Sequence, residues 1–167
     1  NYADTGGGIY QLDNGKTKLY NSIVWGNLDL SEAESNFVNV NSPDPEIYIS
    51  LVGPPFTAAP DGVDVNEISA QSLFVAPESA LQAPTLLGNY RLKRTSVAVN
   101  GGDNGYVTDP NGKDVDGFDR IVGNAVDLGA YEYQGLWKWP PASQLTVSDV
   151  TTDGMRLSWP QAAGIAE

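Results

Sequence analysis

Apolar residues along this chain come in short alternating runs, and most runs are bounded by glycine, asparagine, aspartate or proline. Alternation of apolar and polar positions is typical of strands with one buried face, because successive side chains point to opposite sides. Helical periodicity is hard to find; the longest stretch without a breaker, residues 28–41, becomes strand-like at its end. The pattern therefore predicts an all-β fold of many short strands separated by turns.

The runs fix where these strands are expected. Strands are predicted within residues 6–12, 18–27, 37–41, 46–53, 72–76 and 89–102, with a terminal strand within 120–135. Odd-numbered positions should share one face of each strand: Leu19, Ile23 and Trp25 within 18–27, and Ile47, Ile49 and Leu51 within 46–53. A turn is expected at Asn14-Gly15. Most other connections have about a dozen residues or more, which suits parallel strands better than hairpins.

Two architectures fit many short strands: a sandwich or barrel, and a parallel β-helix whose coils each contribute short strands. The long connections favour the β-helix. Asparagines lie within or at the ends of the predicted strands, at Asn21, Asn27, Asn39 and Asn41. They either turn corners or stack on a copy in the next coil, and their spacing leaves both interpretations open.

Composition narrows the function classes. The chain has 167 residues, 9 basic and 21 acidic, with a net charge of −12 and neither cysteine nor histidine. The acidic balance argues against nucleic acid and anionic membrane partners. Without cysteine or histidine there is no disulfide, no Ser-His-Asp or Cys-His catalysis and no thiolate metal site within the chain. No run approaches the roughly 20 apolar residues of a membrane-spanning helix.

Several motifs together resemble a known family. GGGIY, LYNSIVWGN, IYISLVG, SLFV, NYRLKRTSVAVNGGDN and DVDGFDRIVGNAVDLGAYEYQ, between about residues 6 and 134, resemble the C-terminal coils of secreted bacterial right-handed parallel β-helix proteins, of the choice-of-anchor or polymorphic-outer-membrane-like kind. Two positions depart from that pattern: Gln71-Ser72 replaces Asp-Pro before LFV, and Val97 replaces the proline usual after Ser96. These changes are expected to alter local turns only.

The resemblance implies an extracellular location, secreted or on the bacterial cell surface. It implies a non-catalytic scaffold that binds glycans or host surfaces and needs no cofactor. The alternative is an accessory part of a polysaccharide lyase or glycoside hydrolase acting on acidic polysaccharide, with a basic residue among Arg91, Lys93 and Arg94 as the base. The first coil is expected to be open on one side and able to pair with another copy.

The character of the chain changes after Gln134. Residues 1–135 are predicted to be the terminal coils and closing cap of the β-helix, and 136–144 an apolar, proline-marked linker. Residues 145–167 resemble the first two strands of a fibronectin type III domain, with Leu145, Val147 and Val150 on one strand and Met155, Leu157 and Trp159 on the other. Such a domain needs about 100 residues, so a truncated domain and a piece of a longer protein are expected.

The stretch 120–135 holds the sharpest candidate chemistry. Asp127 and Glu132 are five residues apart, which on a straight strand places them on opposite faces and disfavours a glycosidase pair. Structural closure of the solenoid is favoured instead, with Arg120 in a bidentate pair with one of the two acids. Gly129 would bend the chain and Tyr131, with Tyr133, would cover the end of the solenoid.

Two further sets of candidates remain. Asp103, Asp109, Asp114 and Asp116 carry the oxygen ligands that Ca²⁺ prefers, although neither the EF-hand spacing nor a calcium-binding repeat is present, and a solvated turn-rich loop is the competing interpretation. Trp137 and Trp139 could stack on sugar rings or plug the open end of the β-helix. Trp25 shares the parity of Ile23 and is expected in the core.

Overall fold

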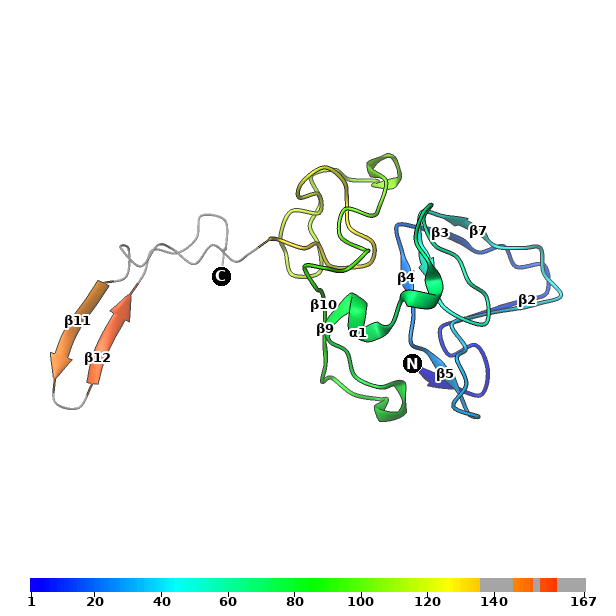
Figure 1. The fold of residues 1–167 in the computed structure, drawn as a ribbon, viewed down its shortest axis with the longest axis horizontal. Helices are drawn as coiled ribbons and strands as arrows, with labels where there is room; N and C mark the ends of the chain where they lie inside the picture. Colours follow the sequence, from blue (N-terminus) through cyan, green and yellow to red (C-terminus); the bar gives the residue numbers. More distant parts are fainter. Residues whose placement is uncertain (136–145, 152–153, 159–167) are drawn as a thin grey trace. The chain divides into compact units, whose positions relative to one another are not determined.

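A computed structural model of the chain describes residues 1–135, 146–151 and 154–158 (Figure 1). The chain divides into two compact units, residues 1–134 and 135–167, and each is described by itself. The described residues form short strands in two-stranded sheets, with one α-helix of four residues. The prediction of a strand-rich fold with little helix is therefore confirmed.

Residues 1–52 make two successive passes with the same order of strands. The first pass holds β1 (Tyr2–Ala3), β2 (Ile9–Leu12), β3 (Lys18–Tyr20) and β4 (Ile23–Val24), and the second holds β5 (Leu28–Asp29), β6 (Phe37–Val40), β7 (Glu46–Tyr48) and β8 (Leu51–Val52). Each strand of the first pass pairs in parallel with its counterpart in the second, from Tyr2↔Leu28 to Val24↔Val52. In Figure 1 the labelled strands β3 and β7 lie side by side.

A sharp corner divides two of the predicted strands. Asn21 separates β3 from β4 with φ +47°, and Ile49 separates β7 from β8 with φ +45°. The continuous strands expected at 18–27 and 46–53 are therefore wrong, and so is the parity drawn across the corners. Ile49 is 37% exposed, whereas Leu51 is fully buried. The alternation of apolar and polar residues predicted the strands, but it did not predict the residue with positive φ at each corner.

Of the two interpretations that the sequence left open for the asparagines, the structure shows corner turning, and it shows no stacking on a copy among the described residues. Asn21 and Asn41 have positive φ and turn corners, which asparagine tolerates better than most residues. Asn39 lies in β6 and accepts a bond of 3.0 Å from the amide of Gln11, its register partner in β2. The amide of Asn27 donates to Asn36 over 2.9 Å. The amide contact between passes thus joins unlike residues rather than copies of one asparagine.

Residues 59–134 are mostly turns. The strand expected at 72–76 begins as helix α1 (Ala70–Leu73), capped by Ser69, and only β9 (Phe74–Ala76) is extended. β10 (Asn89–Leu92) pairs with β9 antiparallel, and the rest of 89–102 forms turns. Short 3₁₀ turns are η1 (Val65–Glu67), η2 (Ala80–Gln82) and η3 (Asn104–Tyr106). The terminal strand predicted within 120–135 is absent from that described stretch.

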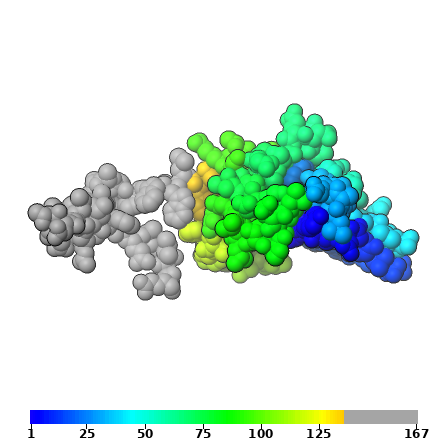
Figure 2. Space-filling model, turned by 90° about the horizontal axis from the view of Figure 1, so that it is seen from below, coloured from blue at the N-terminus to red at the C-terminus, as the bar shows by residue number. Residues whose placement is uncertain are grey.

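The main apolar cluster joins this irregular part to the two passes. Its buried members are Leu51, Leu73, Leu92, Ala98 and Leu128, with Ile23 and Trp25 packed against them. Ile23 and Leu51 are register partners on successive passes, so residues 59–134 lie against the side of both passes. In Figure 2 residues 1–50, in blue and cyan, lie at one side of this unit and the green and yellow residues at the other.

In the second unit, β11 (Thr146–Thr151) and β12 (Gly154–Ser158) form an antiparallel pair with Val147 opposite Leu157. This agrees with the two strands expected there. Leu145 and Trp159, expected on the same strands, lie outside the described residues.

Candidate functional site

Glu132 is the centre of a buried polar network within residues 98–134. Its carboxylate accepts the backbone N–H of Val122 at 2.9 Å and that of Asp127 at 3.0 Å. It also accepts the Arg120 guanidinium at 2.8 Å. The side chain of Glu132 is fully buried, and that of Arg120 is 17% exposed. A segment without strand ladders thus satisfies its backbone through side chains.

Asp127 and Asp114 extend the network in the same way. Asp127 is 1% exposed and accepts the backbone N–H of Asn100 and of Tyr133, on different oxygens. Asp114 accepts two N–H groups from its own turn on one oxygen and the N–H of Glu132 on the other. These bonds tie together turns that are up to 27 residues apart in the chain.

Burial raises the pKa of both Asp127 and Glu132 above the ordinary carboxyl range, because the charged form loses its hydration. The N–H donors from Asn100 and Tyr133 oppose this rise in the pKa of Asp127. The N–H donors of Asp127 and Val122, together with the charge of Arg120, oppose the rise in the pKa of Glu132. Desolvation is the larger effect for both acids.

Arg120 is bound differently from the expected bidentate pair. One guanidinium nitrogen donates to Glu132, and another donates to the carbonyls of Asp127 and Gly129, at 3.2 and 2.8 Å. Because this stretch is not a strand, the parity argument that separated Asp127 from Glu132 fails, and the N–H of Asp127 bonds to Glu132. Three acceptors instead fix the guanidinium between the turns.

Gly129 and Tyr131 lie close to this network. Gly129 has φ +92°, and an added Cβ would lie 3.1 Å from the end of Ile23. Tyr131 is partly exposed, with the guanidinium of Arg91 at 5.2 Å from its ring centroid. Tyr133 packs against the main apolar cluster. The two tyrosines therefore contact different surroundings and do not form one aromatic cover.

The network leaves the two acids no free oxygen. Every carboxylate oxygen of Asp127 and Glu132 accepts at least one bond from the protein. A general acid or nucleophile must reach its substrate within hydrogen-bond distance, and these groups face backbone instead. The geometry therefore favours closure of the fold over glycosidase chemistry for this pair.

The four calcium candidates are each engaged in other interactions. Asp103 and Asp109 each accept an N–H from two residues further on. Asp114 belongs to the buried network, and Asp116 binds Arg91 through two bonds of 2.5 Å. Among the described residues, no three acidic side chains are grouped to hold a metal ion. Asx-type turns account for Asp103, Asp109 and Asp114.

The basic run is partly occupied as well. Arg91 pairs with Asp116, and the ammonium of Lys93 donates to the carbonyl of Gln71 at 2.5 Å. Arg94 is exposed. Tyr90, on the same strand as the buried Leu92, is 39% exposed and packs edge-on against Phe74.

Of the three tryptophans considered above, only Trp25 lies within the described residues. Trp25 packs partly buried against the main apolar cluster, near its expected place. Trp137 and Trp139, the candidates for sugar stacking, lie outside the described residues.

A second site was missed by the sequence analysis: the tyrosine cluster of Tyr20, Tyr48 and Tyr106. Tyr20 and Tyr48 stack with ring centroids 5.0 Å apart, and Tyr106 lies 4.7 Å from Tyr20. A surface hollow of about 590 Å³ adjoins it, lined by Tyr20, Tyr106 and polar groups. Tyr20 and Tyr48 occupy matching positions in LYNSI and IYISL, and that repeat could have revealed them. Tyr106 carries no such signal.

Comparison of the chain with known protein families, with curated proteins and with solved structures found no match. Within the described ranges, no helix combines the length and the apolar character that crossing a membrane requires.

Proposed function

We propose that this chain is a non-catalytic part of a secreted or cell-surface right-handed parallel β-helix protein, which serves as a scaffold for binding glycans or other surface molecules. Residues 1–135 would form terminal coils with the segment that closes them. Residues 145–167 would be the first strands of a fibronectin type III-like domain.

One observation carries the proposal: four strands recur in the same order and pair in parallel with their counterparts one pass later. The step along the chain from a residue to its partner is the same for β2, β3 and β4, and only slightly shorter for β1. Stacked coils of nearly constant length are how a solenoid buries its strands. Crossover connections between parallel strands are nearly always right-handed, which supports the proposed hand.

The sheets also support an extended stack. Among the described residues, each strand of the first pass has a partner on one side only. An edge of this kind can accept another coil or a second copy of the chain. Repeating coils of this type present long side surfaces, and such surfaces suit extended ligands.

The buried acids within residues 120–135 support the assignment of a non-catalytic role. Both acids, Asp127 and Glu132, bind backbone groups on every oxygen. The antiparallel pair of β11 and β12 is what the first two strands of a fibronectin type III-like sandwich would form.

Measurements of glycan binding and of polysaccharide cleavage distinguish this proposal from the alternative, an accessory role in polysaccharide cleavage. The chain would be applied to an array of neutral and acidic glycans and, in parallel, incubated with oligogalacturonates while the unsaturated product is followed by its ultraviolet absorbance. The proposal predicts retention on at least one glycan and no product. Product formation would contradict the non-catalytic assignment, and absence of binding to any glycan would contradict the binding role.

A further inference from the structure

The tyrosine cluster is assembled from three segments. Tyr20 ends β3, Tyr48 ends β7, and Tyr106 ends the turn η3. The rings of Tyr20 and Tyr48 are nearly parallel, at 8°, and Tyr106 is tilted against both, with centroid distances of 4.7 and 5.6 Å. Figure 1 shows the turn that carries η3 beside β3 and β7. Two coils and a distant turn thus present one aromatic surface.

These rings remain open to solvent although they contact each other. Tyr20 and Tyr48 are each 37% exposed and Tyr106 is 41% exposed. In the described part of the chain, the hydroxyls of Tyr20 and Tyr106 bond to no other residue, and that of Tyr48 reaches Glu46 over 3.4 Å. A group of exposed aromatic residues on a strongly charged protein is a typical feature of binding surfaces.

The hollow beside the cluster adds polar groups of both kinds. The polar and charged residues Ser22, Thr108, Asp109, Lys113 and Arg120 line it. Its volume of about 590 Å³ lies within the range of roughly 300–1,000 Å³ seen for ligand sites. Polar and charged residues therefore lie beside the aromatic rings of Tyr20 and Tyr106.

Hydrogen bonds hold the walls of the hollow in place. The amide of Asn21 donates to the carbonyl of Asp103 at 2.9 Å and accepts the N–H of the same residue at 2.8 Å. The N–H of Gly129 bonds to the carbonyl of Asn21 at 2.8 Å. Glu132 and two carbonyls fix Arg120. These bonds hold the walls of the hollow in one arrangement, and a preorganised site reduces the entropy cost of binding.

The charges limit the class of ligand. Lys113 pairs with Asp119 at 2.5 Å, and Arg120 pairs with Glu132, so both cations of the hollow are already neutralised. With a net charge of −12, the protein also repels polyanions at long range. A ligand with apolar ring faces and many neutral hydroxyls fits this lining better than an anionic one.

We propose that the tyrosine cluster and its hollow bind a glycan built of neutral pyranose rings, with a ring stacked on Tyr106 or Tyr20 and its hydroxyls bonded to the polar lining. Aromatic faces attract the C–H faces of sugars through dispersion and the ring quadrupole. This inference rests on the proposed glycan-binding function and assigns a location to it.

The test uses the full chain and soluble manno- and cello-oligosaccharides, with oligogalacturonates as the acidic comparison, measured by titration calorimetry. Tyr106→Ala removes one wall of the site, and Tyr106→Phe keeps the ring. Tyr10→Ala is the matched control, because Tyr10 is 45% exposed on β2 and does not line the hollow.

Binding of a neutral oligosaccharide that weakens about tenfold in Tyr106→Ala, by much less in Tyr106→Phe, and not at all in Tyr10→Ala would support the site. Thermal melting of each variant shows whether it is folded; should Tyr106→Ala unfold, protection of Tyr106 from nitration by the bound oligosaccharide gives the same decision. Glycan binding that all variants retain, or preference for the acidic sugars, would overturn this site while leaving the proposed function intact. Absence of binding to any glycan would overturn both.

Discussion

The two halves of the first unit satisfy their backbones in different ways. In residues 1–53, N–H groups of one pass bond to carbonyls of the other, as Leu51 does to Ser22 and Gly53 to Val24. In residues 98–134, buried carboxylates accept many of the N–H groups instead. A ladder depends on register and tolerates many side chains, whereas a carboxylate network depends on a few identities. The irregular half should therefore be more sensitive to single polar substitutions.

The largest effect is expected at the centre of the network. Glu132→Ala removes the acceptor for two N–H groups and leaves Arg120 without its counter-ion. Loss of one partner of a buried pair costs about 3–5 kcal/mol, and denaturant unfolding would measure it.

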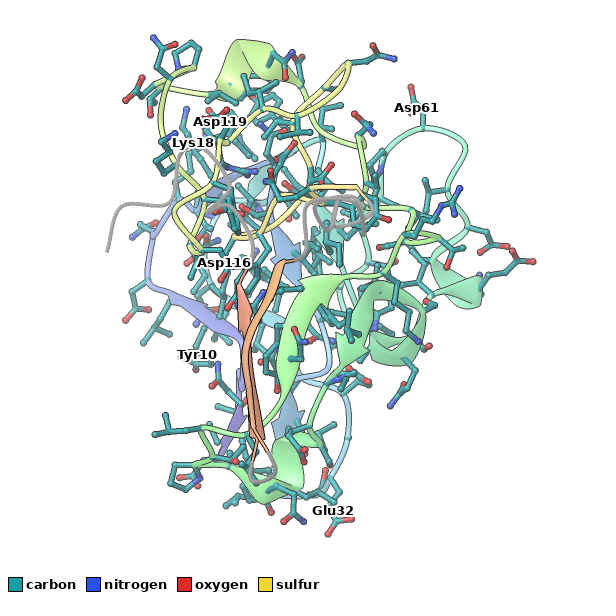
Figure 3. The ribbon with its side chains drawn as sticks, turned by 90° about the vertical axis from the view of Figure 1, so that its left-hand side faces the viewer. Tyr10, Lys18, Glu32, Asp61, Asp116 and Asp119 are labelled. Atoms are coloured by element: carbon teal, nitrogen blue, oxygen red, sulfur yellow. The ribbon has the colours of Figure 1, made fainter. Side chains whose placement is uncertain are left out.

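Asp61→Ala is the matched control, because Asp61 is an exposed acid that projects from the unit (Figure 3). It should change the free energy of unfolding by less than about 0.5 kcal/mol. Equal effects of the two substitutions would show that the network contributes nothing special.

Two glycines separate close packing from backbone strain in the irregular half. Gly129→Ala places a Cβ 3.1 Å from Ile23 at φ +92°, and Gly117→Ala has φ +83° with open space around it. We expect the first to cost about 2–3 kcal/mol and the second about 1–2 kcal/mol, because both share the left-handed strain and only Gly129 faces a neighbour. Unfolding curves for the two variants, side by side, provide the measurement; equal losses would mean that Ile23 moves aside.

In the regular half, one residue can be replaced to raise the stability of the fold. Ile49 is β-branched and has φ +45°, while its counterpart in the first pass is an asparagine. Ile49→Asn should raise the stability by about 1 kcal/mol, because asparagine tolerates this conformation and Ile49 is 37% exposed. Ile49→Val keeps the branching and should give no gain. A lower melting temperature for Ile49→Asn would indicate that the isoleucine contributes packing at this corner.

The acids also predict how stability responds to pH. Asp127 and Glu132 have raised pKa values, so the folded state binds more protons than the unfolded state between the ordinary and the raised values. Stability from these groups therefore falls as pH rises through that window. Melting temperatures should increase as the pH is lowered through that window toward the ordinary carboxyl pKa of about 4.

Asp127→Asn should flatten that slope, because it removes one of the titrating groups, while relief of the general negative charge acts equally on both proteins. The contribution of Glu46 to stability changes with pH in the opposite direction, and it does so at lower pH. Its salt bridges with Lys16 and Lys18 depress its pKa to about 2, so its contribution is lost as pH falls through that value. An unchanged slope in Asp127→Asn would show that Asp127 does not titrate differently on folding.

The sequence predicted much of the regular half and little of the irregular one. Alternation located β2, β3, β6 and β7 within a few residues. It could not report the corners at Asn21 and Ile49, because a single left-handed residue leaves the apolar pattern intact. In 120–135, the residues of a network and of a strand look alike, since Val126, Asp127 and Leu128 alternate as a strand would while all three are buried. Arg120 and Glu132 were found as partners, but their bonds to distant backbone depend on tertiary structure.

Amide hydrogen exchange at residue level tests the contrast most directly. The N–H groups of Val122, Asp127 and Tyr133 belong to no strand but bond to buried carboxylates. If the network holds the irregular half as firmly as the ladder holds the regular one, these protons exchange as slowly as those of Ile9 and Leu51, and far more slowly than that of Asn111 in an exposed turn. Exchange of all three at the rate of Asn111 would contradict a closing role for Arg120, Asp127 and Glu132.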